Sequence, residues 1–299
     1  MPVDIPFRRD MNVDYGAAVA LSPLVRRVVA RNPSMFTFKG TGTYVLGHGR
    51  VAVIDPGPDL TEHVDALLAA LRGETVAAIL LTHTHLDHSP AARALKAATG
   101  AKTYGFGPHG GGVDGDKVEE GGDHDFLPDV PTRDGDVVAG PGWTVEALHT
   151  PGHTSNHLCF GLREEKTLFT GDHVMGWSTT VISPPDGDMR AYMASLRRLL
   201  PREDRLFVPT HGVPIPEPQK YAALLIEHRL EREGEILKAL AAGHATIPAM
   251  VAVIYAQVDK RLHGAAGRSV LAHLRHMVEE GRVLVDGTPS IGARYSLPR

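Results

Sequence analysis

The sequence predicts an α/β protein with a small additional unit at its C-terminal end. Three observations lead to this fold class. Apolar strand-like segments alternate with helical segments through the first half of the chain, clusters of histidine and aspartate follow several strands, and the pattern changes after Gly243. Hydrophobic residues make up 42% and charged residues 22% of the 299 residues, and the net charge is −4. This balance is ordinary for a globular protein and gives no whole-chain attraction to nucleic acid or membrane.

Strand-like and helical patterns follow one another from the first elements onward. Alternating apolar residues on both sides of the turn signal Gly47-His48-Gly49 predict a β-hairpin. Apolar residues at helical spacing then predict a helix with Thr61 as its N-cap. A continuous apolar run predicts a buried strand that leads directly into a histidine cluster. The expected elements are a hairpin at residues 43–54, helices at 61–72 and 91–99, and strands at 76–81 and 102–105.

The second half continues the pattern and then changes. Residues 107–136 are rich in glycine and acids, which predicts a long loop beside the functional site. Further strands are expected at 143–148, 157–160, 167–169 and 206–209, and helices at 189–200 and 218–242. Two helices that begin at Ile247 and Arg268, followed by a hairpin within residues 282–297, indicate a winged-helix-like unit. We therefore expect two domains, residues 1–242 and 243–299.

Four metal-ligand side chains lie within six residues, directly after the predicted buried strand. They are His83, His85, Asp87 and His88. Side chains two residues apart in an extended chain point the same way, so His83 and His85 are placed to grip one ion. Asp87 and His88 can face a second ion once the chain turns into the next helix. Because imidazole nitrogens and carboxylate oxygens are the ligands of catalytic zinc sites, this cluster predicts a metal site.

Three more candidate ligands each follow a strand after a small or turn-forming residue. His153 lies in Thr-Pro-Gly-His-Thr, Asp172 in Thr-Gly-Asp-His and His211 in Pro-Thr-His-Gly. Strand ends are where open α/β sheets bind ligands, so we expect all three on the same rim as the first cluster. The two carboxylate oxygens of Asp172 can each face a different cation.

The order His-x-His-x-Asp-His, Pro-Gly-His-Thr, Thr-Gly-Asp and a late His-Gly resembles the metallo-β-lactamase superfamily over about residues 32–215. The resemblance implies an αββα sandwich of two mixed sheets with helices outside. It also implies that Asp55 steadies a ligand histidine. The implied ligands are His83, His85, His153 and Asp172 for one ion, and Asp87, His88, His211 and the shared Asp172 for the other.

Two departures from the family pattern and the C-terminal unit refine the resemblance. Ser89-Pro90 stands where the family often has two glycines, which removes no ligand, and no cysteine occupies a ligand position. The winged-helix-like tail resembles the β-lactamase-like-2 branch, which includes a mitochondrial endoribonuclease. The segments 32–37 and 40–44 also resemble that branch.

These features predict a binuclear hydrolase. Two divalent cations, zinc by default with manganese or iron as alternatives, lower the pKa of a shared water from 15.7 toward about 7. The resulting bridging hydroxide would attack an ester, thioester or lactone, and Asp87 is the catalytic candidate that orients the nucleophile or moves its proton. The alternative is a metal-dependent endoribonuclease or phosphodiesterase whose C-terminal domain guides single-stranded RNA. Residues 244–299 hold seven Lys/Arg against four Asp/Glu, which is too weakly basic to favour that alternative.

The remaining expectations concern location and the other histidines. The single cysteine, Cys159, has apolar neighbours and is expected in the core, and the absence of disulfides suits a reducing cytoplasm. No signal-peptide pattern is present and no run approaches the ~20 apolar residues of a membrane span, so we expect a cytoplasmic protein. A homo-oligomer is left open. We expect His48 to be exposed, His149, His157 and His173 to be structural, and His109 and His124 to be possible substrate contacts.

Overall fold

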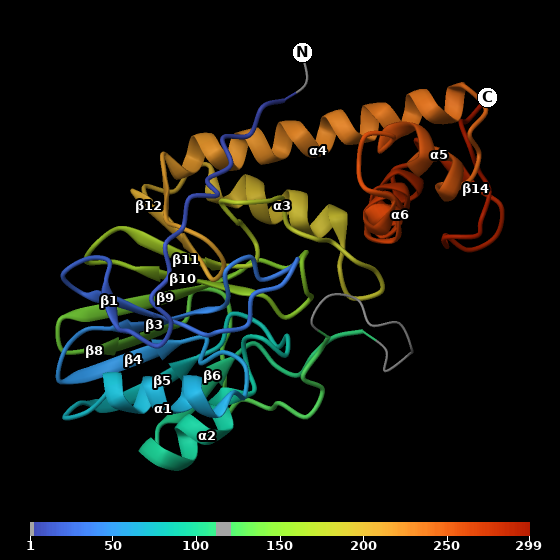
Figure 1. Cartoon of the computed structure of the whole chain (residues 1–299). Helices are drawn as coiled ribbons and strands as arrows, with labels where there is room; N and C mark the ends of the chain where they lie inside the picture. Colours follow the sequence, from blue (N-terminus) through green and yellow to red (C-terminus); the bar gives the residue numbers. More distant parts are fainter. Residues whose placement is uncertain (1–2, 112–120) are drawn as a thin grey trace.

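The computed structural model of the chain describes residues 3–111 and 121–299. Two β-sheets pack face to face, and helices cover the outer face of each sheet (Figure 1). The first sheet has the strand order β1-β2-β3-β4-β5-β6-β7 and the second has the order β13-β12-β11-β10-β9-β8. The αββα sandwich of mixed sheets that the sequence predicted is therefore confirmed.

The strands of both sheets are short, and most of the central ones are buried on both faces. The first sheet consists of β1 (Val19–Ala20), β2 (Val25–Val29), β3 (Gly42–Leu46), β4 (Arg50–Ile54), β5 (Thr75–Leu80), β6 (Lys102–Gly105) and β7 (Val130–Pro131). The second consists of β8 (Val137–Gly140), β9 (Trp143–His149), β10 (Leu158–Leu162), β11 (Thr167–Gly171), β12 (Leu206–Pro209) and β13 (Ile215–Pro216).

Strand β3 shows why the sequences of the central strands are continuous apolar runs. Tyr44 and Leu46 point into the core between the two sheets, where they meet Trp143 and Phe169 of the second sheet. Val45, between them in sequence, points to the opposite face and packs in the core beneath the helices. Because both faces of the strand are covered, apolar residues occupy consecutive positions rather than alternate ones.

The helices form the outer layers. Helices α1 (Thr61–Ala70) and α2 (Ala91–Thr99) cover the first sheet, and α3 (Met189–Leu199) and α4 (Pro218–Ala241) lie against the second (Figure 1). Asp188 is the N-cap of α3, and its side chain accepts a hydrogen bond from the backbone N–H of Ala191 at 2.7 Å. None of the helices in the described part of the chain combines the length and apolar character needed to cross a membrane.

The C-terminal unit packs around the far end of α4. It contains α5 (Ile247–Ile254), a short 3-10 turn (Lys260–Leu262), α6 (His263–Glu279) and the two-stranded β14 (Leu284–Val285) and β15 (Tyr295–Ser296). Its core includes Ile236 and Leu240 of α4 together with Met250, Leu274 and Tyr295. The last two turns of α4 are therefore part of this core. The domain boundary between residues 242 and 243 stays a prediction.

Some local features differ from the sequence-based expectations. Leu60, not Thr61, is the N-cap of α1, and no side chain caps this helix end. Helix α6 begins at His263, five residues before the expected start at Arg268. Strands β1, β2, β7, β8 and β13 were not predicted. β1, β7 and β13 have only two residues each, β8 is a four-residue edge strand, and Arg26 and Arg27 interrupt the apolar run of β2. Part of the predicted 107–136 loop, residues 112–120, lies outside the described residues.

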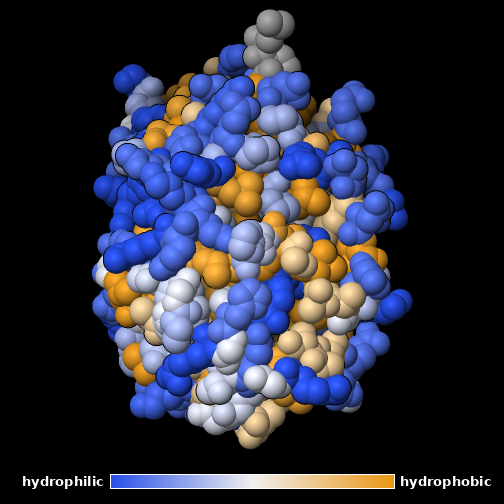
Figure 2. All heavy atoms as spheres, turned by 90° about the vertical axis from the view of Figure 1, so that its left-hand side faces the viewer, coloured by the Kyte–Doolittle hydropathy of each residue, from blue (hydrophilic) through white to orange (hydrophobic). Residues whose placement is uncertain are grey.

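One face of the molecule mixes hydrophilic and apolar residues (Figure 2). Figure 2 shows the face formed by the left-hand side of Figure 1, where apolar side chains are interspersed among hydrophilic ones. This mixture agrees with the ordinary composition of the chain.

Candidate metal centre

The histidine cluster occupies the loop between β5 and α2, as the sequence predicted. The backbone of this loop is fixed on both sides. The N–H of Leu158 donates to the carbonyl of Thr82 at 2.7 Å, and His85 forms an isolated bridge with Gly122. His88 ends the cluster, where its carbonyl accepts from the N–H of Gly57 at 2.8 Å. These bonds hold the four side chains of the cluster in a buried position.

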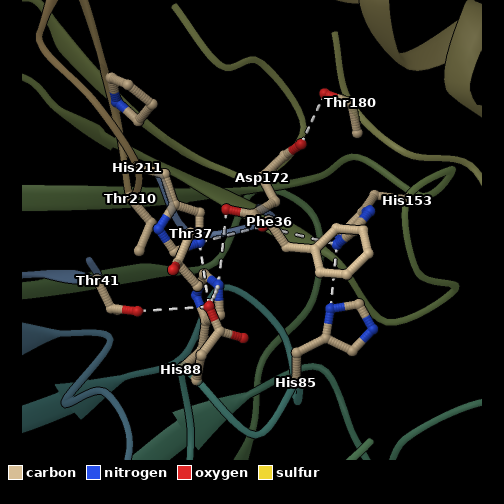
Figure 3. A network of polar contacts seen from close by, with 12 residues as sticks. Phe36, Thr37, Thr41, His85, His88, His153, Asp172, Thr180, Thr210 and His211 are labelled. Atoms are coloured by element: carbon tan, nitrogen blue, oxygen red, sulfur yellow. Dashed lines mark hydrogen bonds and ion pairs between the residues drawn. The ribbon is translucent and has the colours of Figure 1, made fainter. Parts of the chain in front are cut away.

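Three imidazoles converge at one end of the site. His83 Nε2 lies 3.0 Å from His85 Nδ1, and His153 Nε2 lies 3.1 Å from the same atom. Two of the three rings are two positions apart in the chain, and the third, that of His153, comes from a loop 68 positions after His85 that follows β9 (Figure 3). Four ligands around a tetrahedral ion with bonds of about 2.0–2.1 Å stand roughly 3.3 Å apart, so the spacing of these nitrogens suits one zinc-sized ion.

A second group lies directly beside the first. His211 Nε2 lies 3.0 Å from Asp87 Oδ2, and His88 Nε2 lies 3.3 Å from the same oxygen. Asp172 stands between the two groups: its oxygens are 3.6 Å from His88 Nε2, 3.4 Å from His211 Nε2 and 3.8 Å from His153 Nε2. All seven predicted ligand side chains are therefore brought together, and all are buried.

The hydrogen bonds on the outer sides of the rings test whether this donor set fits cations. His153 Nδ1 donates to the carbonyl of Val181 at 2.8 Å, and His211 Nδ1 donates to the carbonyl of Gly40 at 3.2 Å. His88 Nδ1 lies 2.9 Å from a carboxylate oxygen of Asp55. Each of these rings thus carries a proton on Nδ1, so Nε2 is the nitrogen that faces the site and serves as a metal ligand once it is deprotonated. Ring nitrogens and carboxylate oxygens that face one another at 3.0–3.6 Å fit a site that holds cations.

Two buried atoms support the same fit. His88 Nε2 and Asp172 Oδ1 have no hydrogen-bond partner within the described part of the chain. Leaving such groups unsatisfied inside a protein costs free energy. The two atoms lie 3.6 Å from each other, so one cation bound between them would satisfy both.

Asp55 organises the site from behind. This buried residue, with φ of +47°, follows β4 and accepts hydrogen bonds from the N–H of Thr82 at 2.7 Å and from the Thr82 hydroxyl at 2.7 Å. The hydroxyl of Thr210 donates to it at 3.0 Å, in addition to His88. One carboxylate therefore ties together the residues that precede His83 and His211.

The electrostatics of the two groups differ. Burial, followed by the neighbouring imidazoles, holds the pKa values of His83 and His85 well below the usual range, so both rings are neutral. Burial opposes the charged form of His211, but Asp172 and Asp87 outweigh it and raise its pKa to about 10. The pKa of Asp172 is held well below its usual range by His211 and His88, against the effect of burial. Burial also opposes the ionisation of Asp87, but His88 and His211 hold its pKa well below the usual range, so both aspartates are anionic and able to balance positive charge.

Comparison with known proteins decides the family. Residues 37–211 match the sequence family described as the Metallo-beta-lactamase superfamily, and residues 246–292 match the Beta-lactamase associated winged helix domain. The chain belongs to the metallo-beta-lactamase superfamily. It is therefore a hydrolase of this superfamily with a C-terminal winged helix domain, as the motifs predicted.

Relatives of this metallo-beta-lactamase chain include named enzymes. It is 32% identical over 223 residues to an atrochrysone carboxyl ACP thioesterase of Cryptosporiopsis sp. (strain 8999), covering 74% of this chain but only 64% of that protein. It is 31% identical to the beta-lactamase-like protein 2 homolog of Drosophila melanogaster, covering 90% of this chain and 92% of the relative. A crystal structure of a beta-lactamase domain protein from Burkholderia ambifaria has a TM-score of 0.81 with 19% identity, covering 98% and 97% of the two chains, which shows the shared fold.

The other histidines of this metallo-beta-lactamase fold lie close to where the sequence placed them. His48 is exposed in the β3–β4 turn, and His149 stacks on Phe106 with ring centroids 4.1 Å apart. His157 is buried behind His83, with its ring 5.2 Å away. His173 points away from the ligands, and its ring packs against Tyr192. Cys159 is buried in the core that contains Tyr192, as expected. His109 lies beside His85 and contacts His124, which keeps both near the rim.

The sequence missed several residues that support the ligands. Thr82 and Thr210 directly precede ligand histidines, and that adjacency is a signal that could have found them. Thr41 donates to Asp87 Oδ2 at 3.4 Å, and Thr180 donates to the carbonyl of Asp172 at 2.8 Å. No local pattern marks Thr41 or Thr180, because each meets its partner only through the fold.

A cleft opens beside the ligands. His153 and Asp172 are part of its lining. Figure 3 shows the Phe36 ring next to His153. The remaining wall is largely apolar and consists of Met35, Phe36, Met175, Trp177, Ser178 and Val181. Trp177 is stacked on Phe38 with ring centroids 4.9 Å apart, which fixes its orientation.

Proposed function

We propose that this chain is a binuclear metal-dependent hydrolase that cleaves a thioester with an apolar acyl group. The convergence of imidazole nitrogens and carboxylate oxygens from His83, His88, His153, Asp172 and His211 is the observation that carries this proposal. The same proposal includes esters and lactones, whose carbonyl chemistry is the same.

The proposed ligands divide into two sets that share one residue. The first ion would be held by His83, His85, His153 and Asp172, and the second by Asp87, His88, His211 and Asp172. Zinc suits this imidazole-rich donor set, and manganese or iron would suit its two carboxylates. Asp172, which lies within 3.8 Å of members of both groups, is placed to serve both ions.

The residues of the chain have separate tasks in the proposed reaction. When bound, the two cations supply positive charge that activates a water molecule and polarises the substrate carbonyl. Asp87 orients the attacking water or takes its proton, and Thr41 fixes the Asp87 carboxylate through its hydroxyl. Asp55 holds the imidazole of His88 in one orientation through Nδ1. Because the ligands are buried, bulk water is kept from the charged centre, which strengthens its electrostatic effect.

The thioester preference comes from the cleft and from the relatives. An apolar wall of aromatic and methionine side chains suits an apolar acyl group next to the proposed cations. Several of the similar proteins are named as acyl carrier protein thioesterases. Both observations favour a thioester of a bulky acyl group over a small polar ester.

A substrate panel on protein of measured metal content tests the proposal. We expect about two metal ions per chain and hydrolysis of acyl thioesters, with S-lactoylglutathione and an aromatic lactone as further substrates. His85→Ala and Asp172→Ala should lose both metal and activity, whereas His48→Ala, which changes an exposed histidine far from the ligands, should keep both. Full activity of the first two variants would refute the proposed site.

The same panel separates the alternative function. Metal-dependent cleavage of single-stranded RNA that weakens steeply with salt, without thioester turnover, would favour the endoribonuclease. Three further expectations remain predictions. They are the domain boundary at residues 242–243, the cytoplasmic location and the homo-oligomer.

A further inference from the structure

One buried segment contacts both halves of the proposed metal centre. The Thr180 hydroxyl lies 2.8 Å from the carbonyl oxygen of Asp172 and 3.0 Å from that of His173, so its proton is shared between them (Figure 3). The carbonyl of the next residue, Val181, accepts the Nδ1 proton of His153 at 2.8 Å. Two neighbouring residues therefore fix the backbone that carries one proposed ligand and the ring orientation of another.

This segment is in turn held by an arginine from helix α4. Arg229 Nη2 donates to the carbonyl of Thr180 at 2.5 Å, and Arg229 is only 3% exposed. Its guanidinium also lies 5.2 Å from the centre of the Tyr192 ring. Arg229 Nε has no hydrogen-bond partner among the described residues. Burying a guanidinium on such limited polar contacts is costly, which suggests that the position serves a purpose other than stability.

Tyr192 gives Arg229 a second route to the same two ligands. Its ring packs against His173, with centroids 5.0 Å apart, directly after Asp172. Its backbone closes on Gly152, directly before His153, so closely that a Cβ at Gly152 would lie 2.4 Å from the Tyr192 Cα. The φ of Gly152, +146°, also favours glycine. The arginine thus supports Tyr192 and Thr180, which both contact the ligand-bearing loops.

We propose that Arg229 is a positioning residue that holds His153 and Asp172 in ligand geometry through Thr180, Val181 and Tyr192. Helix α4 carries Arg229 near its middle, and its last turns form part of the C-terminal core. Arg229 therefore couples the helix that supports the winged helix domain to the metal centre. The inference rests on the proposed ligand roles of His153 and Asp172.

Cobalt binding tests the inference without relying on activity. Co²⁺ replaces zinc in such sites, and its visible absorption reports ligand geometry. We expect Arg229→Met, which keeps much of the side-chain volume but removes every donor, to alter the cobalt spectrum and weaken cobalt affinity at least about 10-fold, the lower end for loss of a group that orients a metal ligand. Arg229→Lys, which keeps the charge and one donor group, should recover part of the loss.

Two further variants make each result decisive. Arg232 lies on the same helix but pairs with Glu235 and does not contact Thr180. The Arg232→Met variant should therefore leave the cobalt spectrum unchanged. If Arg229→Met does not fold, Thr180→Val, which removes only the hydroxyl, should give the altered spectrum, with Thr180→Ser restoring it.

Three outcomes overturn the proposals in distinguishable ways. A folded Arg229→Met variant with the wild-type spectrum and an affinity within twofold of wild type overturns the positioning role alone. Thr180→Val with a wild-type spectrum does the same where Arg229→Met is unfolded. Wild-type protein that binds no cobalt or zinc overturns the ligand assignment, and the positioning role with it.

Discussion

Asp55 Oδ2 lies 2.9 Å from His88 Nδ1, and both side chains are fully buried. This contact fixes the proton of the imidazole on the side away from the other ligands. The same carboxylate also binds Thr82 and Thr210, which stand at the ends of two strands in different sheets. A single side chain therefore sets the relative positions of the loops that carry His83, His88 and His211.

Replacing Asp55 by asparagine should weaken metal binding without removing a ligand. The amide has only one oxygen to accept the hydrogen bonds that the two carboxylate oxygens accept. Its NH₂ group is a donor and would face another donor, such as the Nδ1–H of His88. We expect metal affinity to fall about 10–100-fold, measured by competition with a chromophoric chelator. Asp65→Asn, at an exposed position of α1, is the matched control and should bind metal as the wild type does.

Trp177→Ala should change substrate preference more than the rate of chemistry. The ring lines the apolar wall of the cleft, so its loss removes contact with a bulky acyl group. We expect KM for an aromatic or long-chain acyl thioester to rise about 10-fold, the effect of losing roughly 1.4 kcal/mol of apolar contact, with little change for an acetyl thioester. Leu200→Ala, at the exposed end of α3, should alter neither value. An equal change for both thioesters would contradict an acyl pocket at this position.

Glu233 should make stability depend on pH at the junction of α4 and α6. This buried carboxylate lies 2.9 Å from His276 Nδ1 and 2.6 Å from Arg282 Nη1. Burial opposes ionisation, but His273, His276 and Arg282 outweigh it and hold the pKa of Glu233 well below 4.5. Because the folded-state pKa lies below the unfolded value, the ionised group stabilises the fold above about pH 4.5, and this contribution declines as the pH falls below that value.

The Glu233→Gln variant measures this contribution. We expect it to unfold with a free energy about 3 kcal/mol lower at pH 7, the lower end for breaking a buried ion pair, since Arg282 is partly exposed. The deficit should stay constant from pH 7 to about pH 4.5 and shrink below that value, as followed by urea denaturation across the pH range. Glu235→Gln, which removes a more exposed carboxylate of the same helix, should change stability by less than about 0.5 kcal/mol.

Cys159 should be unreactive in the folded protein. Burial raises the pKa of its thiol to about 12, although the Thr150 hydroxyl donates a hydrogen bond to its sulfur at 3.2 Å. The thiolate therefore remains scarce between pH 7 and pH 9, where an exposed cysteine ionises appreciably. A thiol-specific disulfide reagent at pH 8 should label the native chain very slowly and the guanidinium-unfolded chain rapidly. Rapid labelling of both forms would contradict the buried position.

Much of the candidate site follows from short stretches of sequence. The ligand residues His83, His85, Asp87 and His88 are neighbours in the chain, and their place after an apolar strand identifies a strand end. His153 and His211 were found by the same rule, because each follows a strand and a small residue. The prediction that Thr61 is the N-cap of α1 was wrong. The choice between Leu60 and Thr61 depends on the backbone angles at the helix start, and residue type alone does not determine these angles.

The sequence by itself determined the α/β class, the order of the main elements and the identity of the seven ligand-type side chains. These properties depend on apolar periodicity and on residues that are close together in the chain. The family resemblance implied that Asp55 steadies a ligand histidine, but only the tertiary structure decided that this histidine is His88. It also decided that Thr180 holds the Asp172 segment and that Arg229 supports Thr180. The physical reason is that these hydrogen bonds join residues far apart in sequence, 49 positions in the case of Arg229 and Thr180, so no local pattern encodes them. Their geometry exists only once the two sheets and α4 have packed.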